Sequence, residues 1–86
     1  MNDSHRKAVD ELLEKVAAHE KAHGPDTDLA KVAEAARAHR ENPSDKTAAA
    51  DLGEKIHETI GKIEEEHLDL IDILNRVSYF LSGSGI

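Results

Sequence analysis

The sequence predicts an all-α protein, and three observations support that prediction. Apolar residues recur every three or four positions along most of the 86-residue chain, which is the spacing of one face of a helix. Gly24-Pro25 and Asn42-Pro43 are helix-ending signals that divide the chain into segments. The last third is the most apolar part and stops at the sequence Ser-Gly-Ser-Gly-Ile, residues 82–86.

The first helix is expected over residues 5–23. Asp3 or Ser4 can accept hydrogen bonds from its first amides, and Gly24-Pro25 ends it. A second helix is expected over residues 28–42, where Asp26 and Thr27 offer caps and Pro43 prevents continuation. The apolar stripes are Val9, Leu12, Leu13 and Val16 on the first helix, and Leu29, Val32, Ala33 and Ala36 on the second.

The third helix is expected to run without interruption over residues 45–82, with Ser44 as its cap and residues 83–86 as a flexible tail. Its apolar positions alternate between spacings of three and four, which indicates a heptad seam of the coiled-coil kind with one stutter. A helix of ~38 residues spans roughly 57 Å, about twice the first helix. A helical hairpin plus one long C-terminal helix is therefore the expected architecture of a single domain, residues 1–86.

A four-helix bundle is the alternative architecture. It requires a break between Gly61 and Leu68, which would give four helices of similar length. The three consecutive glutamates at 64–66 would suit the first turn of a new helix, but glutamate is also a strong helix former in an exposed interior. Gly61 alone is a weak breaker, so continuity is favoured.

Composition excludes several functional classes. A formal charge of −7, without a basic stripe, argues against binding nucleic acid or an anionic membrane. The chain has no cysteine, so disulfides and thiolate metal sites are excluded. No apolar leader or run long enough to span a membrane is present, and a cytoplasmic location is expected by default.

The six histidines are the main chemical lead. His19-Glu20-Lys21-Ala22-His23 fits the His-Glu-x-x-His pattern, which sets two imidazoles one helical turn apart as a zinc site requires. A metalloprotease also needs a third ligand, a cleft and a larger scaffold, so we expect no enzyme. His19 and His23 stay candidates for a surface zinc site, but no four ligands converge in one chain, and we expect no specific metal or cofactor.

Two Glu-x-x-His units, Glu54 to His57 and Glu64 to His67, repeat the unit of di-iron carboxylate bundles. On one continuous helix they lie ~15 Å apart and point in different directions, so they converge only if the chain turns back or a partner supplies the second unit. The expected role of His67 is instead a polar seam position that fixes the register of packing.

Self-association is the expected function, because the C-terminal apolar side chains cover a wider arc than one neighbouring helix can bury. We expect a small acidic protein that forms a homodimer through residues 63–81 and contacts other proteins. A histidine and carboxylate metal-binding bundle is the alternative function. The expected interface residues are Ile63, His67, Leu70, Ile71, Leu74, Val77, Phe80 and Leu81.

The C-terminal quarter also resembles a known family. Residues 63–70 read Ile-Glu-Glu-Glu-His-Leu-Asp-Leu, and residues 81–86 read Leu-Ser-Gly-Ser-Gly-Ile. These segments are similar to a family of short bacterial proteins classed as a domain of unknown function, with an acidic run, a His-Pro-x-Leu step and a Leu-x-x-x-Gly-Ile terminus. Leu68 stands where that family has proline. The resemblance implies a short helical protein and assigns no catalytic or binding residue.

Overall fold

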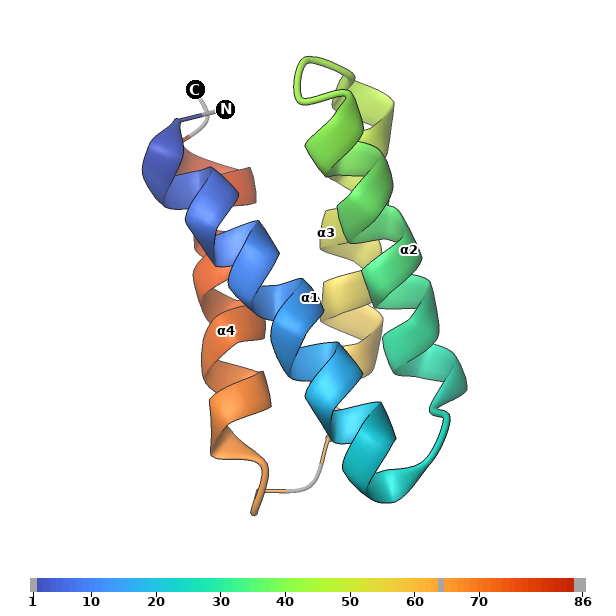
Figure 1. The fold of residues 1–86 in the computed structure, drawn as a ribbon. Coiled ribbons are helices and arrows are strands. Elements are labelled where there is room, and N and C mark those ends of the chain that lie inside the picture. Colours follow the sequence, from blue (N-terminus) through green and yellow to red (C-terminus); the bar gives the residue numbers. More distant parts are fainter. Residues whose placement is uncertain (1, 64, 85–86) are drawn as a thin grey trace.

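The computed structural model describes residues 2–63 and 65–84, and these residues form four α-helices and a short terminal π-helix (Figure 1). The α-helices are α1 (Asp3–His23), α2 (Thr27–Glu41), α3 (Lys46–Ile60) and α4 (Leu68–Tyr79), and the π-helical turn η1 covers Phe80–Ser84. No strand occurs in the described ranges, so the all-α prediction is confirmed.

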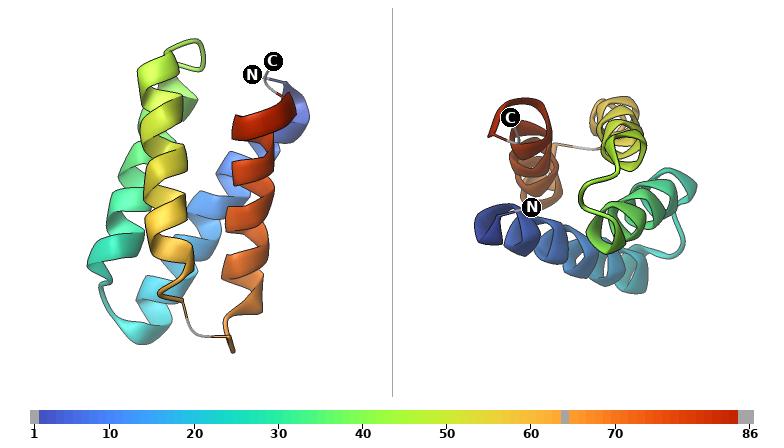
Figure 2. Two further views of the ribbon diagram at one scale, coloured as in Figure 1. Left: turned by 180° about the vertical axis from the view of Figure 1, so that it is seen from behind. Right: turned by 90° about the horizontal axis from the view of Figure 1, so that it is seen from above.

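The four helices run alternately up and down the bundle. α1 packs against α2 and α4, and α3 closes the bundle by packing against the same two helices (Figures 1 and 2). This arrangement measures 34 × 21 × 20 Å along its principal axes. Of the helices described, none is long and apolar enough to cross a bilayer.

Capping side chains explain where the first three helices begin. Asn2 accepts a hydrogen bond from the amide of His5 at 2.7 Å, so the N-cap of α1 is Asn2 rather than the expected Asp3 or Ser4. Asp26 accepts from two amides of the first turn of α2, as predicted. Asp45, rather than the expected Ser44, caps α3, because its carboxylate can accept from two amides of the first turn.

The long C-terminal helix expected over 45–82 is divided in the structure. α3 stops at Ile60, Gly61 forms its C-cap, and α4 starts at Leu68. The residues that the structure covers therefore form four α-helices, as in the alternative architecture, rather than three. Folding back lets the apolar face of α4 pack against the other helices of the same chain, which a projecting helix cannot do. Glu65 and Glu66 lie in the connection rather than in the first turn of a helix, and Glu64 lies outside the described residues.

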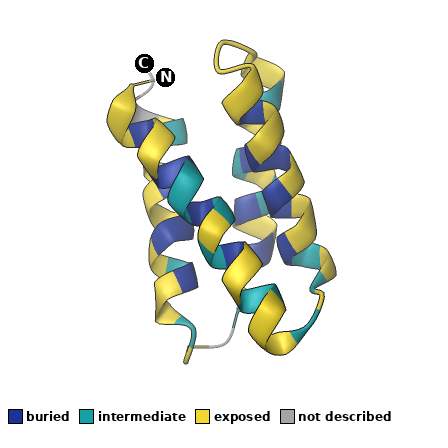
Figure 3. Ribbon diagram, in the orientation of Figure 1, coloured by how far each residue is buried: buried dark blue, intermediate teal, exposed yellow. Residues whose placement is uncertain are grey.

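The core takes its side chains from all four helices (Figure 3). Leu70, Leu74 and Val77, which were expected at a dimer interface, are buried inside the single chain. The other five expected interface residues, Ile63, His67, Ile71, Phe80 and Leu81, are partly buried. Of the expected tail, residues 83 and 84 belong to η1, and residues 85 and 86 lie outside the described part.

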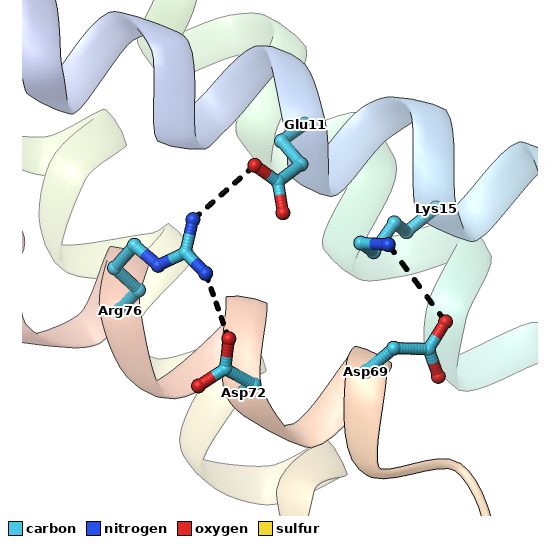
Figure 4. Close-up of polar contacts among 5 residues, drawn as sticks. All are labelled: Glu11, Lys15, Asp69, Asp72 and Arg76. Atoms are coloured by element: carbon cyan, nitrogen blue, oxygen red, sulfur yellow. Dashed lines mark hydrogen bonds and ion pairs between the residues drawn. The ribbon is translucent and has the colours of Figure 1, made fainter.

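Ion pairs align α4 with α1 along the outside of the core (Figure 4). Arg76 donates to Glu11 at 3.2 Å and to Asp72 at 2.7 Å, and Lys15 lies 3.9 Å from Asp69. These contacts follow one another down the antiparallel pair toward the C-terminus of α1. Beyond Lys15 and Asp69 in that direction lie His19 and His23 of α1 and His67 before α4.

Candidate metal centre

Three histidines meet at the end of the bundle where α1 stops and α4 starts. His19 and His23 lie in the last turns of α1, four positions apart and therefore on one face of the helix. His67 is the residue immediately before α4 and serves as its N-cap position. Antiparallel packing of α1 against α4 brings His67 to the two α1 histidines.

The three imidazoles form one cluster. Their ring centroids are 4.6 Å apart for His19 and His23, 4.7 Å for His19 and His67, and 5.1 Å for His23 and His67. One ligand nitrogen from each ring lies within 4.8 Å of the other two. In a tetrahedral zinc site, bonds of about 2.05 Å set ligand nitrogens about 3.3 Å apart, so modest rotation of the side chains closes the site.

The cluster borders a cavity of about 400 Å³. His23 is exposed, while His19 and His67 are half-buried, so a metal at the cluster would keep access to solvent. Three carboxylates, from Asp26, Asp28 and Glu66, also line this cavity. Glu66 lies 3.8 Å from the Nε2 atom of His67, so its carboxylate places a negative charge beside the cluster.

Glu20 has a structural role in this region. Its carboxylate accepts a hydrogen bond from the amide of Asp26 at 3.2 Å, which links the end of α1 to the start of α2. In the metalloprotease pattern the corresponding glutamate is the general base that activates a water molecule. In this protein the Glu20 carboxylate instead stabilises the turn between α1 and α2 through its hydrogen bond from Asp26.

The structure separates the two Glu-x-x-His units of the di-iron hypothesis. His57 is exposed on α3 and lines a different cavity from the one that His67 borders. Glu54 is exposed, and Glu64 lies outside the described residues. The geometry therefore joins His67 to His19 and His23, and leaves His57 out.

Sequence reasoning identified His19 and His23 as metal candidates but missed His67 as their third partner. Its expected place was on a continuous helix far from α1, and only the turn after Ile60 returns it to that helix. The expectation that no specific metal binds rested on too few convergent ligands. The structure changes that premise, because three imidazoles suffice for a zinc site with an open fourth position.

No protein-family model matches this chain, and no match was found among curated proteins or solved structures. The resemblance of its C-terminal quarter to a bacterial family therefore stays a prediction.

Proposed function

We propose that this protein is a zinc-binding helical bundle, with His19, His23 and His67 as ligands. The observation that carries the proposal is the convergence of three imidazole ligand atoms within 4.8 Å from two separate segments of the chain. Neutral imidazole suits zinc and the neighbouring transition metals, whereas magnesium and calcium prefer oxygen ligands. The bound ion would tie the start of α4 to the end of α1.

Charge and access support the same proposal. Three carboxylates line the cavity, from Asp26, Asp28 and Glu66, against one ammonium group, that of Lys62, which lies 3.6 Å from Asp28. The negative charge that remains attracts a divalent cation. An exposed His23 gives the ion a route of entry. The fourth coordination position would face water, so the proposal covers metal binding and assigns no reaction to the site.

Calorimetry with zinc after chelator treatment tests the proposal. Wild-type protein is expected to give a saturable one-to-one isotherm with a dissociation constant below about 1 μM. His67→Ala removes one of three ligands and should weaken binding by at least about tenfold, and His19→Ala plus His23→Ala should abolish it. His57→Ala is the matched control, because His57 lies outside the cluster, and it should bind as wild type does.

Two outcomes would contradict the zinc assignment. A wild-type titration without saturable heat would remove it altogether. Equal weakening by His57→Ala and His67→Ala would show that zinc binds histidines without selecting this cluster.

As a second candidate function we propose self-association through the outer edge of α4. The supporting observation is that Leu68 and Tyr79 are the exposed large apolar side chains among the described residues, at 68% and 66% exposure. Eleven positions apart on one helix, they lie on nearly the same face. A homodimer on this edge would bury little apolar area because most apolar side chains of α4 already face the core, so weak association is expected.

Sedimentation equilibrium tests the homodimer. The double variant Leu68→Ser with Tyr79→Ser should reduce association while leaving helix content unchanged. A wild-type chain that stays monomeric at high micromolar concentration would remove this second candidate.

A further inference from the structure

The far end of the bundle carries a second cavity with a different chemistry. It has a volume of about 740 Å³ and lies between α3 and the end of α4, with the start of α1 and the end of α2 also contributing residues. Pockets for small organic molecules are commonly of this size. We call it the upper groove, because this end lies at the top of Figure 1.

Two buried histidines line the upper groove. His5 and His39 are 6% and 3% exposed, and their Nε2 atoms are 3.2 Å apart, so one ring donates to the other. Among the described residues, the Nδ1 atom of His39 has no hydrogen-bond partner. A buried polar atom of this kind is costly, and because it has almost no exposed surface, a molecule in the groove does not reach it in this structure.

The walls of the groove are apolar. Ala49, Ala50 and Gly53 on α3 line one side, and Phe80 and Leu81 of η1 line the other. A Cβ atom placed on Gly53 would lie 3.9 Å from the Cδ1 atom of Leu81, so the two walls come close at that point. An alkyl chain would bury apolar surface by lying beside this contact, against Ala49, Ala50 and Phe80.

The charges in the groove are of one sign, although the whole chain carries −7. Its lining includes no aspartate or glutamate from the described residues, and its titratable members are Lys46, His57 and the buried histidine pair. Lys46 is also the first residue of α3, where the positive end of the helix dipole lies. Asp45 directs its carboxylate to the α3 amides as a cap.

From the apolar walls and the one-sided charge, we propose that the upper groove binds a single-chain amphipathic carboxylate. The alkyl chain lies against Ala49, Ala50 and Phe80. The carboxylate faces Lys46 and accepts hydrogen bonds from its ammonium group. This site is separate from the zinc cluster, which lies at the opposite end of the bundle.

Three probes with the same alkyl chain test the proposal: octanoate, octanol and octylamine, all at monomeric concentrations. Isothermal titration with the full-length chain should show saturable octanoate binding. Octanol should bind about tenfold more weakly, because it lacks the charge-assisted hydrogen bonds, and octylammonium should not bind. Backbone chemical shifts should move at Ala49, Gly53 and Phe80 and stay in place at His19 and His23.

Matched variants locate the ligand. Gly53→Leu places a larger side chain in the groove where its walls meet and should abolish octanoate binding. Gly53→Ala adds one carbon at ordinary contact distance and should keep octanoate affinity within about twofold. Lys46→Gln should weaken octanoate about threefold, while Lys31→Gln, an equal charge change at a residue outside the groove, should leave it unchanged.

Three results would overturn the proposal. Absence of saturable octanoate binding removes the site. Octanol binding as tightly as octanoate shows a purely apolar groove that does not select a carboxylate. Wild-type affinity in Gly53→Leu, or equal effects of Lys46→Gln and Lys31→Gln, places the ligand elsewhere on the surface.

Discussion

The buried histidine pair occupies positions that usually hold apolar side chains. Burial lowers the pKa of both His5 and His39, and for His5 the neighbouring His39 and the charge of the N-terminus lower the pKa further. The pair therefore stays neutral in the folded chain at a pH where free histidine begins to protonate. His5 also stacks on Phe80, the first residue of η1, with ring centroids 5.3 Å apart, so the pair contacts the end of the bundle's last segment.

We predict that acid destabilises the fold through this pair. Both pKa values are lowered in the folded state, so below the ordinary histidine value of about 6.5 the unfolded chain binds more protons. The free energy of unfolding should then fall as the pH drops from 7 to 5. Lys46 and His57, both on α3, line the same groove as the histidine pair.

Denaturant unfolding at a series of pH values measures this dependence. The double variant His5→Leu with His39→Leu removes both titrating groups and should show a flatter decline between pH 7 and pH 5. A decline as steep as that of the wild type would assign the acid sensitivity to other groups.

Gly24 and Gly61 both end helices, but their backbone conformations differ. Gly24 ends α1 with a φ of 88°, a backbone conformation that side chains with a Cβ rarely adopt, whereas Gly61 has a φ of −74°. Gly24→Ala should therefore lower the free energy of unfolding by about 1 kcal/mol. Gly61→Ala has open space around its Cβ and should be neutral or slightly stabilising. Thermal melts of the two variants, compared with wild type, would contradict this account if both changes had the same sign.

At the scale of helices, the sequence could predict what depends on neighbours along the chain. Gly24-Pro25 and Asn42-Pro43 end helices where expected, and Asp26 caps α2, because capping and proline exclusion are local effects. The break after Ile60 is different. Its local signal, Gly61, is weak, and the gain from folding α4 back depends on packing between distant segments.

The ligands of the proposed zinc site also divide into those that local sequence could predict and one that it could not. The α1 histidines could be predicted from their spacing of four, which is a property of one helix. His67 joins them only through the chain reversal and the register of α4 on α1, which ion pairs such as Lys15 with Asp69 help to set. Neither of these follows from spacing along the sequence.

We predict that α4 is stabilised mainly by its buried face. Leu74 is fully buried and Leu68 is largely exposed on the same helix. Leu74→Ala should cost about 2–5 kcal/mol of unfolding free energy, because it removes buried methyl groups and leaves a cavity. Leu68→Ala, the same chemical change at the surface, should change it by less than about 0.5 kcal/mol. Chemical denaturation measures both, and similar costs would mean that Leu68 is covered in solution.

At the scale of the whole molecule, the proposed zinc ion would couple the last turn of α1 to the start of α4. We predict that zinc raises the melting temperature with a logarithmic dependence on its free concentration, and stabilises the fold by about 2.7 kcal/mol at one hundred times its dissociation constant. Acidification should reduce the effect, because protonated imidazole cannot coordinate a metal.

Differential scanning calorimetry with and without zinc measures the coupling, and sedimentation run in parallel checks that the mass stays constant. In His67→Ala, whose affinity is at least about tenfold weaker, the same zinc concentration should stabilise the fold by no more than about 1.4 kcal/mol, so the melting temperature should rise less than in wild type. A rise as large as that of the wild type would argue against coordination by the cluster. A rise accompanied by doubling of the mass would place the ion between chains.

An even number of alternating helices places the start of α1 and the end of η1 beside each other, at the end of the bundle away from the zinc cluster (Figure 1). The bundle is 34 Å long, so a group joined to either terminus is held about one bundle length from His19, His23 and His67. A fluorophore, a fusion partner or a solid support attached there would leave the cluster facing outward. The same end of the bundle carries the upper groove, so a bulky tether there should affect ligand binding at the groove and leave zinc binding unchanged.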